Sequence, residues 1–254
     1  MNSNLDLYQK SNMIKNNPSE LVKKDENLKR VFERLMLGNT KFIESRNKPA
    51  EEIDNNFVYS DKNRSLKQMN TTVSSLKNIE KFNNLENKST KFFVFTCIDC
   101  EMDIPALFHL NPEEVFVYKN IGNLIISKDE NLLCAIEYAT ETLQIRNFII
   151  LGHSRCLAIR EAIYPSTNGI VNRWLKNIRL IAEENRHLLC ETKMDIENYE
   201  VNFSKINIKE QMKRFSKLSL IQDLNKKGEK VYIHGFQLLN NLGKIISIEV
   251  LHSR

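Results

Sequence analysis

The sequence predicts an α/β fold with a parallel-dominated central sheet, flanked by helices and preceded by a helical N-terminal arm. Three observations support this prediction. Short runs rich in aromatic and β-branched residues at 92–96, 114–118 and 148–151 are typical of buried strands. Helical patterns separate these runs, and such alternation is typical of parallel strands joined by helices. Another helical pattern, with apolar residues between 21 and 43, precedes the first run and predicts the arm.

Residues 1–90 are predicted to form this helical arm and an irregular insert. The arm pattern begins after Asn17-Pro18-Ser19, and Gly38-Asn39 predicts a helix end followed by a second short helix. Between Asn47 and Lys91 the sequence is polar and irregular, which is typical of a long surface loop. The first predicted strand follows this insert.

Residues 91–254 are predicted to form the core, with C-terminal helices and a closing strand pair. Helical patterns are expected at 104–110, 131–143, 157–163, 169–189 and 206–224. The apolar runs 231–236 and 245–248 are separated by Asn240-Asn241-Leu242-Gly243, a combination typical of a hairpin-like strand pair.

Composition excludes several classes of partner. The net charge of +5 is spread over the chain without a basic block, so neither nucleic acid nor a membrane surface is an expected partner. No apolar run approaches the roughly 20 residues of a membrane-spanning helix. The first twenty residues lack the apolar stretch of a signal peptide, and five cysteines do not suggest a disulfide framework. A cytoplasmic protein in a reducing compartment is expected.

Two of the predicted strands end in side chains that bind metals. The run 92–96 leads into Cys97, Asp99 and Cys100, and the run 148–151 leads into His153 and Cys156. In an open parallel sheet, neighbouring strands deliver functional groups at their carboxyl ends. Two thiolates and an imidazole are a ligand set for zinc with one coordination position left over. The core is therefore predicted to bind Zn²⁺.

Short motifs are spaced along the chain around these candidate ligands. They are, in order, Leu37-Gly38-Asn39-Thr40-Lys41-Phe42, Cys97-Ile98-Asp99-Cys100-Glu101, Asn120-Ile121-Gly122-Asn123, Gly152-His153-Ser154-Arg155-Cys156, Asn207-Ile208-Lys209-Glu210-Gln211 and Ile233-His234-Gly235-Phe236. Each is a weak signal alone. In this order and spacing they resemble the motifs of the β-class carbonic anhydrases, and the resemblance covers most of the chain.

The resemblance implies reversible hydration of carbon dioxide to bicarbonate at a zinc ion held by Cys97, His153 and Cys156, with Asp99 as a catalytic residue. It implies that the N-terminal arm embraces a second subunit, so that the protein is a homodimer or a higher homo-oligomer. Zinc is a Lewis acid that lowers the pKa of water from about 15.7 toward about 7. Residues expected near the site by their place in the motifs are Gly122, Asn123 and Arg155.

One position departs from the family pattern. Where active members carry an arginine that pairs with the aspartate and holds it off the metal, this chain has Glu101. Two neighbouring carboxylates repel, which should raise the pKa of one of them and leave Asp99 available as a fourth zinc ligand. Arg155 or Lys119 is a candidate substitute cation. Leu157 stands where the family usually has glycine, and it could crowd the approach to the metal.

Three functions therefore stay open. The first is a working carbonic anhydrase with a rewired aspartate. The second is a zinc-binding relative whose site is closed by Asp99, inactive toward carbon dioxide or acting on another small substrate. The third is a redox pair formed by Cys97 and Cys100. The redox alternative leaves His153 and Cys156 unexplained, and it places the Asp99 charge between the thiols, where it disfavours a thiolate.

Overall fold

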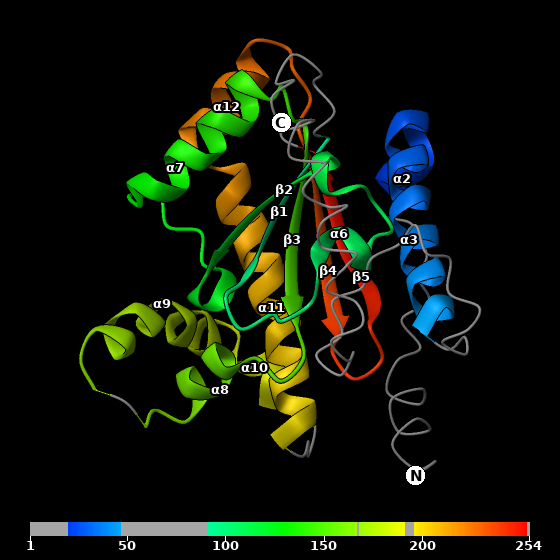
Figure 1. Cartoon of the computed structure of the whole chain (residues 1–254). Coiled ribbons are helices and arrows are strands. Elements are labelled where there is room, and N and C mark those ends of the chain that lie inside the picture. Colours follow the sequence, from blue (N-terminus) through cyan, green and yellow to red (C-terminus); the bar gives the residue numbers. More distant parts are fainter. Residues whose placement is uncertain (1–19, 47–90, 167, 191–195, 253–254) are drawn as a thin grey trace, which may run out of the picture.

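A five-stranded sheet in the order β2-β1-β3-β4-β5 organises the protein (Figure 1). The computed structural model describes residues 20–46, 91–166, 168–190 and 196–252. The strands are β1 (Phe92–Cys97), β2 (Val115–Asn120), β3 (Asn147–His153), β4 (Tyr232–Leu239) and β5 (Lys244–His252). β2, β1, β3 and β4 pair in parallel, and β5 is antiparallel to β4. The predicted α/β fold with a parallel-dominated sheet is confirmed.

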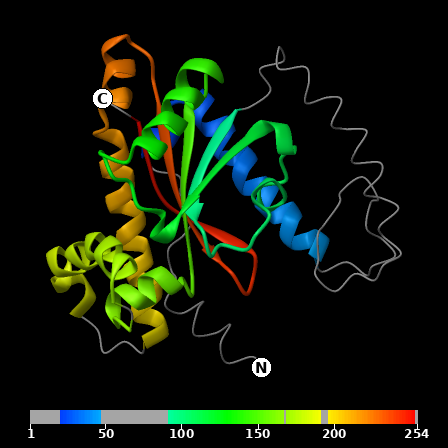
Figure 2. The same cartoon turned by 60° about the vertical axis from the view of Figure 1, so that its left-hand side comes forward.

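Helices cover both faces of the sheet (Figures 1 and 2). On one face lie α2 (Glu20–Lys24), α3 (Glu26–Arg46) and α6 (Ile104–Leu107), and on the other lie α7 (Glu130–Glu137), α11 (Ile196–Ser216) and α12 (Ser219–Lys226). Strand β1 is buried on both sides: Phe92 and Val94 pack toward the first layer, and Phe93 and Phe95 toward the second. A strand covered on both faces reads as a continuous apolar run, which is why β1 shows no alternation of polar residues.

A third apolar cluster lies at the carboxyl ends of the strands. It contains residues of α8 (Leu157–Ile163), α9 (Ile170–Glu184) and α10 (Arg186–Cys190), together with Cys97 and Cys156. Short helical turns complete the described chain: η3 (Pro112–Glu114), η4 (Ile121–Asn123) and the π-helical η5 (Tyr138–Thr142). The two cysteines therefore sit where the sheet meets this cluster.

The predicted helix end at Gly38-Asn39 is wrong, because α3 runs through both residues to Arg46. Gly38 is needed for close packing: a Cβ at this position would lie 1.9 Å from the carbonyl oxygen of Phe108. The buried Asn39 side chain donates to Gly243 O at 2.8 Å and accepts from the Ile245 amide at 2.9 Å. The Gly-Asn pair thus joins the helix to the rest of the fold, and it does not end the helix.

The described part of the N-terminal arm is fixed to the core by polar contacts. Arg34 donates to both carboxylate oxygens of the buried Glu114 at 2.9 Å, and Tyr232 Oη donates to Asp25 Oδ2 at 2.6 Å. Burial acts to raise the pKa of Glu114, but the bonds from Arg34 and Lys91 outweigh it and hold that pKa below its usual value. The predicted arm start at residues 17–19 and the insert at 47–90 lie outside the described residues.

Among the described residues, no helix combines the length and apolar character that crossing a membrane requires.

Candidate metal centre

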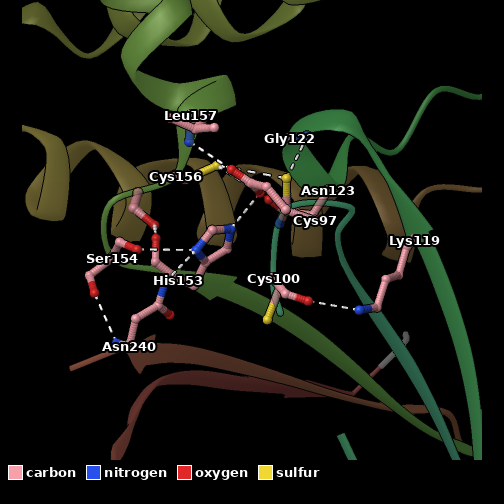
Figure 3. Close-up of polar contacts among 12 residues, drawn as sticks. Cys97, Cys100, Lys119, Gly122, Asn123, His153, Ser154, Cys156, Leu157 and Asn240 are labelled. Carbon is pink, nitrogen blue, oxygen red and sulfur yellow. Dashed lines mark hydrogen bonds and ion pairs between the residues drawn. The ribbon is translucent and has the colours of Figure 1, made fainter. Parts of the chain in front are cut away.

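The chain segments that follow β1 and β3 bring four metal-binding side chains together. β1 and β3 are adjacent and parallel, with Phe92 paired to Asn147 and Thr96 to Leu151, so their carboxyl ends meet at one edge. The ligand atoms of Cys97, Asp99, His153 and Cys156 all lie within 4.8 Å of one another. We call these four residues the donor group. Figure 3 shows Cys97, His153 and Cys156 pointing toward one another.

The turn after β1 is set by backbone bonds. The Ile98 amide donates to Asn120 O at 2.9 Å, and the Cys100 amide donates back to Cys97 O at 3.1 Å. Lys119 Nζ donates to Cys100 O at 2.7 Å and holds the outgoing end of the turn (Figure 3). The turn therefore folds Asp99 back over the end of the strand.

The orientation of the His153 ring is fixed by the chain that follows it. His153 Nδ1 lies 3.1 Å from Ser154 O, an acceptor, and 3.3 Å from Asn240 Nδ2. Ser154 is itself held by Leu238, whose carbonyl accepts from the Ser154 amide at 2.8 Å. With Nδ1–H directed at a carbonyl, Nε2 is the nitrogen that faces the donor group, where it lies 2.8 Å from Asp99 Oδ1.

Asp99 is held inside the donor group at both of its oxygens. Oδ2 accepts from the Leu157 amide at 2.7 Å, and Oδ1 lies 3.7 Å from Cys156 Sγ in addition to its bond with His153. Burial acts to raise the pKa of Asp99, but hydrogen bonds from His153, Cys97 and the Leu157 amide outweigh it and hold the pKa well below its usual value. Asp99 is therefore a carboxylate.

Repulsion by Glu101 does not govern this carboxylate. The predicted rise in pKa is not found at Asp99, because His153 and the Leu157 amide stabilise its charge. Glu101 is exposed and lies outside the donor group. The cation that pairs with Asp99 is His153, at 2.8 Å, whereas Lys119 donates to Cys100 O and Arg155 is exposed with a left-handed φ of 56°.

Hydrogen bonds among the two sulfurs and the imidazole change the pKa values of all three groups. Cys97 Sγ and Cys156 Sγ lie 3.7 Å apart, and the hydrogen bond between them lowers the pKa of the Cys97 thiol and raises that of the Cys156 thiol. Burial acts to lower the pKa of His153, but the bonds to Asp99 and Cys97 raise it to about 10. Without a bound cation, the group therefore combines a thiolate, a carboxylate and an imidazolium.

The chemistry of the donor group fits zinc. Thiolate, imidazole and carboxylate are the protein ligands that Zn²⁺ takes, and soft sulfur donors disfavour Mg²⁺ and Ca²⁺. The sulfurs and imidazole are buried, with Cys97 at 0%, His153 at 1% and Cys156 at 3% exposure. Supporting bonds to Cys97 and to His153 Nδ1 are also in place, as is usual for metal ligands. The group could therefore hold one zinc ion.

Other residues singled out from the sequence divide into two sets. Gly122 lies at the site, because its amide donates to Cys97 Sγ at 3.1 Å, and Asn123 beside it is buried. The thiol of Cys100 points away from those of Cys97 and Cys156 and is buried in the core under α3 and α6 (Figure 3). A Cys97–Cys100 redox pair is therefore not assembled. The Leu157 side chain is 62% exposed, and its backbone amide makes the contact with the site.

Residues that the sequence did not single out also support the site. Asn240, in the turn between β4 and β5, donates from its backbone amide to Ser154 Oγ at 3.0 Å, and its side chain lies beside His153 Nδ1. The spacing between 153 and 240 gives no sequence signal for this contact. Ser154 lies inside a motif that the sequence did identify, but its backbone contacts depend on the pairing of β3 with β4.

Two cysteines, a histidine and an aspartate at the carboxyl ends of adjacent parallel strands define an α/β protein with a side-chain group that could hold a metal ion. The family model described as carbonic anhydrase matches residues 92–245, which is more than half of the chain. The chain belongs to the carbonic anhydrase family, and its relatives place it in the β class.

Individual relatives agree with this assignment. A carbonic anhydrase of Emericella nidulans is 27% identical over 173 residues, which cover 67% of this chain and 75% of the relative. The mitochondrial β carbonic anhydrase 6 of Arabidopsis thaliana is 30% identical over 169 residues, which cover 63% of this chain and 57% of the relative.

Solved structures share the fold. A tetrameric β-carbonic anhydrase of Sordaria macrospora aligns with a TM-score of 0.63 at 20% identity, covering 73% of this chain and 95% of that one. A Coccomyxa β-carbonic anhydrase in complex with acetazolamide aligns with a TM-score of 0.62 at 20% identity, covering 74% of this chain and 89% of that one.

Proposed function

We propose that this chain is a zinc-dependent carbonic anhydrase that interconverts carbon dioxide and bicarbonate. The observation that carries the proposal is the convergence of Cys97, Asp99, His153 and Cys156 within 4.8 Å. Membership of the carbonic anhydrase family supports the choice of reaction.

In this proposal Cys97, His153 and Cys156 hold the zinc ion and Asp99 is the catalytic carboxylate. When bound, zinc supplies the Lewis acidity that makes water nucleophilic near neutral pH. His153 Nε2 cannot bind a metal and donate a proton to Asp99 at the same time, so metal binding breaks the 2.8 Å bond between them. Asp99 Oδ1 is then able to accept a proton or a hydrogen bond, while the Leu157 amide keeps Oδ2 in place.

Metal content and hydration rate test this proposal together. The purified protein should carry about one zinc per chain, and it should accelerate carbon dioxide hydration in a stopped-flow assay. Acetazolamide, which one related enzyme binds, is a suitable inhibitor for titrating the site. As a matched control, Cys100→Ser alters a cysteine outside the donor group and should leave the zinc content unchanged. A preparation that binds no zinc would contradict the proposal.

A second candidate is a zinc site closed by Asp99, without activity toward carbon dioxide or with another small substrate. It is favoured by one observation: Asp99 Oδ1 already lies within the donor group, where its ion-pair partner is His153, itself a proposed zinc ligand. A fourth protein ligand would leave no position for water, as in structural zinc sites.

One substitution distinguishes the working carbonic anhydrase from the zinc site closed by Asp99. If the site is closed, Glu101→Arg should supply a competing cation and raise hydration from near background, whereas Glu101→Gln should not. X-ray absorption of the zinc protein should then show one fewer protein oxygen ligand in the arginine variant. An active wild type that gains nothing from the arginine would exclude the closed site.

We also infer that the protein is a homo-oligomer. Large apolar residues are exposed in the single chain, with Ile98 at 61% and Ile170 at 75%, and association would remove them from water. The related Sordaria enzymes are tetramers. Sedimentation should give at least a dimer, and a monomer at micromolar concentration would contradict this. A cytoplasmic location remains a prediction.

A further inference from the structure

The turn η4, which follows β2, presents a backbone amide to a proposed zinc ligand. The Gly122 N–H donates to Cys97 Sγ at 3.1 Å. The backbone is left-handed at Gly122 (φ 77°) and at Asn123 (φ 44°), so a side chain at position 122 would be strained. A Cβ there would also lie only 2.6 Å from Ile178 Cδ1. The turn is therefore shaped to bring this amide close to the sulfur.

A hydrogen bond to a ligand sulfur changes what the sulfur gives to the metal. The N–H withdraws electron density from the thiolate, so the sulfur neutralises less of the charge of the cation. Two thiolates donate more charge than imidazoles would, and this opposes the acidification of water by zinc. The position of the Gly122 amide thus affects both zinc affinity and Lewis acidity.

Two buried carboxamides on α11 reach this turn. Asn207 Nδ2 donates to Gly122 O at 3.2 Å and to Asn123 Oδ1 at 3.3 Å. Gln211, one helical turn later, donates from Nε2 to Asn207 Oδ1 at 2.8 Å and accepts from the Ile125 amide at 2.8 Å. Asn207 is 1% exposed and Gln211 is 0% exposed, so water cannot replace these bonds.

The direction of this chain of bonds is determined at both ends. The Ile125 amide can only donate, so the Gln211 atom that meets it must be the oxygen. The Gln211 nitrogen must then donate to Asn207 Oδ1, and the Asn207 nitrogen is left to meet Gly122 O, which can only accept. Both positions need a side chain that donates and accepts at once. The chain of bonds therefore clamps the turn from residue 122 to residue 125.

The helix that carries the two carboxamides is itself fixed on the strand that bears His153. A Cβ at Gly152 would lie 2.7 Å from the Ile208 side chain, so the missing side chain lets α11 pack closely on β3. Ser204 Oγ on the same helix donates to His153 O at 3.3 Å. The helix α11, packed on β3, therefore positions both the Gly122 amide and the His153 imidazole.

We propose that Asn207 and Gln211 are positioning residues that aim the Gly122 amide at Cys97 Sγ and thereby set the donor strength of that sulfur toward zinc. This inference rests on the proposed function, because it takes Cys97 as a zinc ligand.

Two near-isosteric substitutions test it, Gln211→Met and Asn207→Leu. Each should weaken zinc binding about tenfold or more in chelator competition, the range expected when support for a ligand is lost. Each should also shift the thiolate-to-metal charge-transfer absorption of the cobalt(II) protein, which loss of stability alone does not shift. Gln237→Met is the matched control: Gln237 is also buried and also bonded to α11, through Val201 O at 2.9 Å, but this bond does not hold the turn at Gly122. It should leave affinity and spectrum unchanged.

A measurement on the unmodified protein guards against variants that fail to fold. In the ¹¹³Cd-substituted wild type, the Gly122 amide proton should show scalar coupling to the metal through the N–H···S bond. Absence of this coupling, or variants with wild-type affinity and spectrum, would overturn the inference while leaving zinc binding intact. A wild type that binds no zinc, cadmium or cobalt would overturn the proposed function as well.

Discussion

Two buried histidines on adjacent strands differ sharply in their protonation. His153 ends β3 and His234 lies within β4, and they are 1% and 0% exposed. The pKa of His153 is raised to about 10, because bonds to Asp99 and Cys97 outweigh the effect of burial. The pKa of His234 is lowered to about 3, because burial acts on it alone. Similar burial thus gives a charged ring in one place and a neutral ring in the other.

The difference lies in what faces each ring. His153 Nε2 meets a carboxylate at 2.8 Å, whereas His234 Nε2 lies 3.4 Å from the neutral side chain of Asn147 and its ring stacks on Phe236. Desolvation penalises the imidazolium at both sites, and only nearby negative charge can offset it. In this chain, the buried histidine on which anionic donors converge is the candidate ligand, and the one that faces only neutral groups is not.

The largest effect should come from removing one imidazole and not the other. His153→Gln should weaken zinc binding by more than about a hundredfold, because loss of a residue that only supports a ligand already lowers metal affinity by about 10–100-fold. His234→Gln should leave zinc affinity within about threefold, because this ring lies outside the donor group. Chelator competition measures both, and a comparable loss in the two variants would break the distinction between the rings.

The next largest effect should be the pH dependence of zinc affinity, because zinc displaces protons from its ligands. At pH 7.5 the metal-free His153 and Cys156 hold protons, because their pKa values are raised, whereas Cys97 and Asp99 have lowered pKa values. Zinc binding should therefore release about two protons, and affinity should fall up to about a hundredfold for each pH unit that the pH is lowered. Calorimetry in buffers of different ionisation enthalpy counts these protons. His234→Gln should give the same number as the wild type.

The lowered pKa of His234 should make the protein less stable as the pH falls below 6.5. Its pKa is about 3 in the folded protein and about 6.5 in the unfolded chain, so the unfolded chain binds the extra proton between these values. The free energy of unfolding should therefore fall as the pH falls from 6.5, by about 1.4 kcal/mol per pH unit from this group. Urea denaturation from pH 6.5 to 4.5 tests it, and an unchanged slope in His234→Gln would contradict it.

The smallest effects should come from the amides beside the two rings. Asn240→Ala removes a contact at His153 Nδ1 and should weaken zinc binding by about tenfold or less, with little change in its pH dependence. Asn147→Ala removes the 3.4 Å contact with His234 and should lower the free energy of unfolding by about 1 kcal/mol without affecting zinc. If Asn147→Ala weakened zinc binding, the environments of His153 and His234 would not be independent, and the comparison would fail.

The strands and most helices could be predicted because their signals are local. The run 92–96 is apolar throughout, and the structure buries every residue of β1. The pair Gly38-Asn39 predicts a helix end because glycine and asparagine are common there, and the sequence does not show that Phe108 packs against position 38. The stop signal was overridden by a contact between residues far apart in the sequence.

At the site, the sequence identified the side chains that meet, but it did not give the balance of charges among them. The expected conflict between Glu101 and Asp99 followed from their proximity in sequence. In the structure, Asp99 instead faces His153 and the Leu157 amide, 54 and 58 residues away along the chain. These partners lower the pKa of Asp99 where repulsion would raise it.

The sequence by itself determined where Cys97, His153 and Cys156 would converge, because strand patterns and the rule that parallel strands present their carboxyl ends together are local information. Only the tertiary structure decided which partners hold the Asp99 carboxylate, that His153 is the charged histidine and His234 the neutral one, and that α11 supports the Gly122 amide. Charge and hydrogen bonding depend on distances across the folded chain, and contacts such as that between Gln211 and Ile125 span 86 residues.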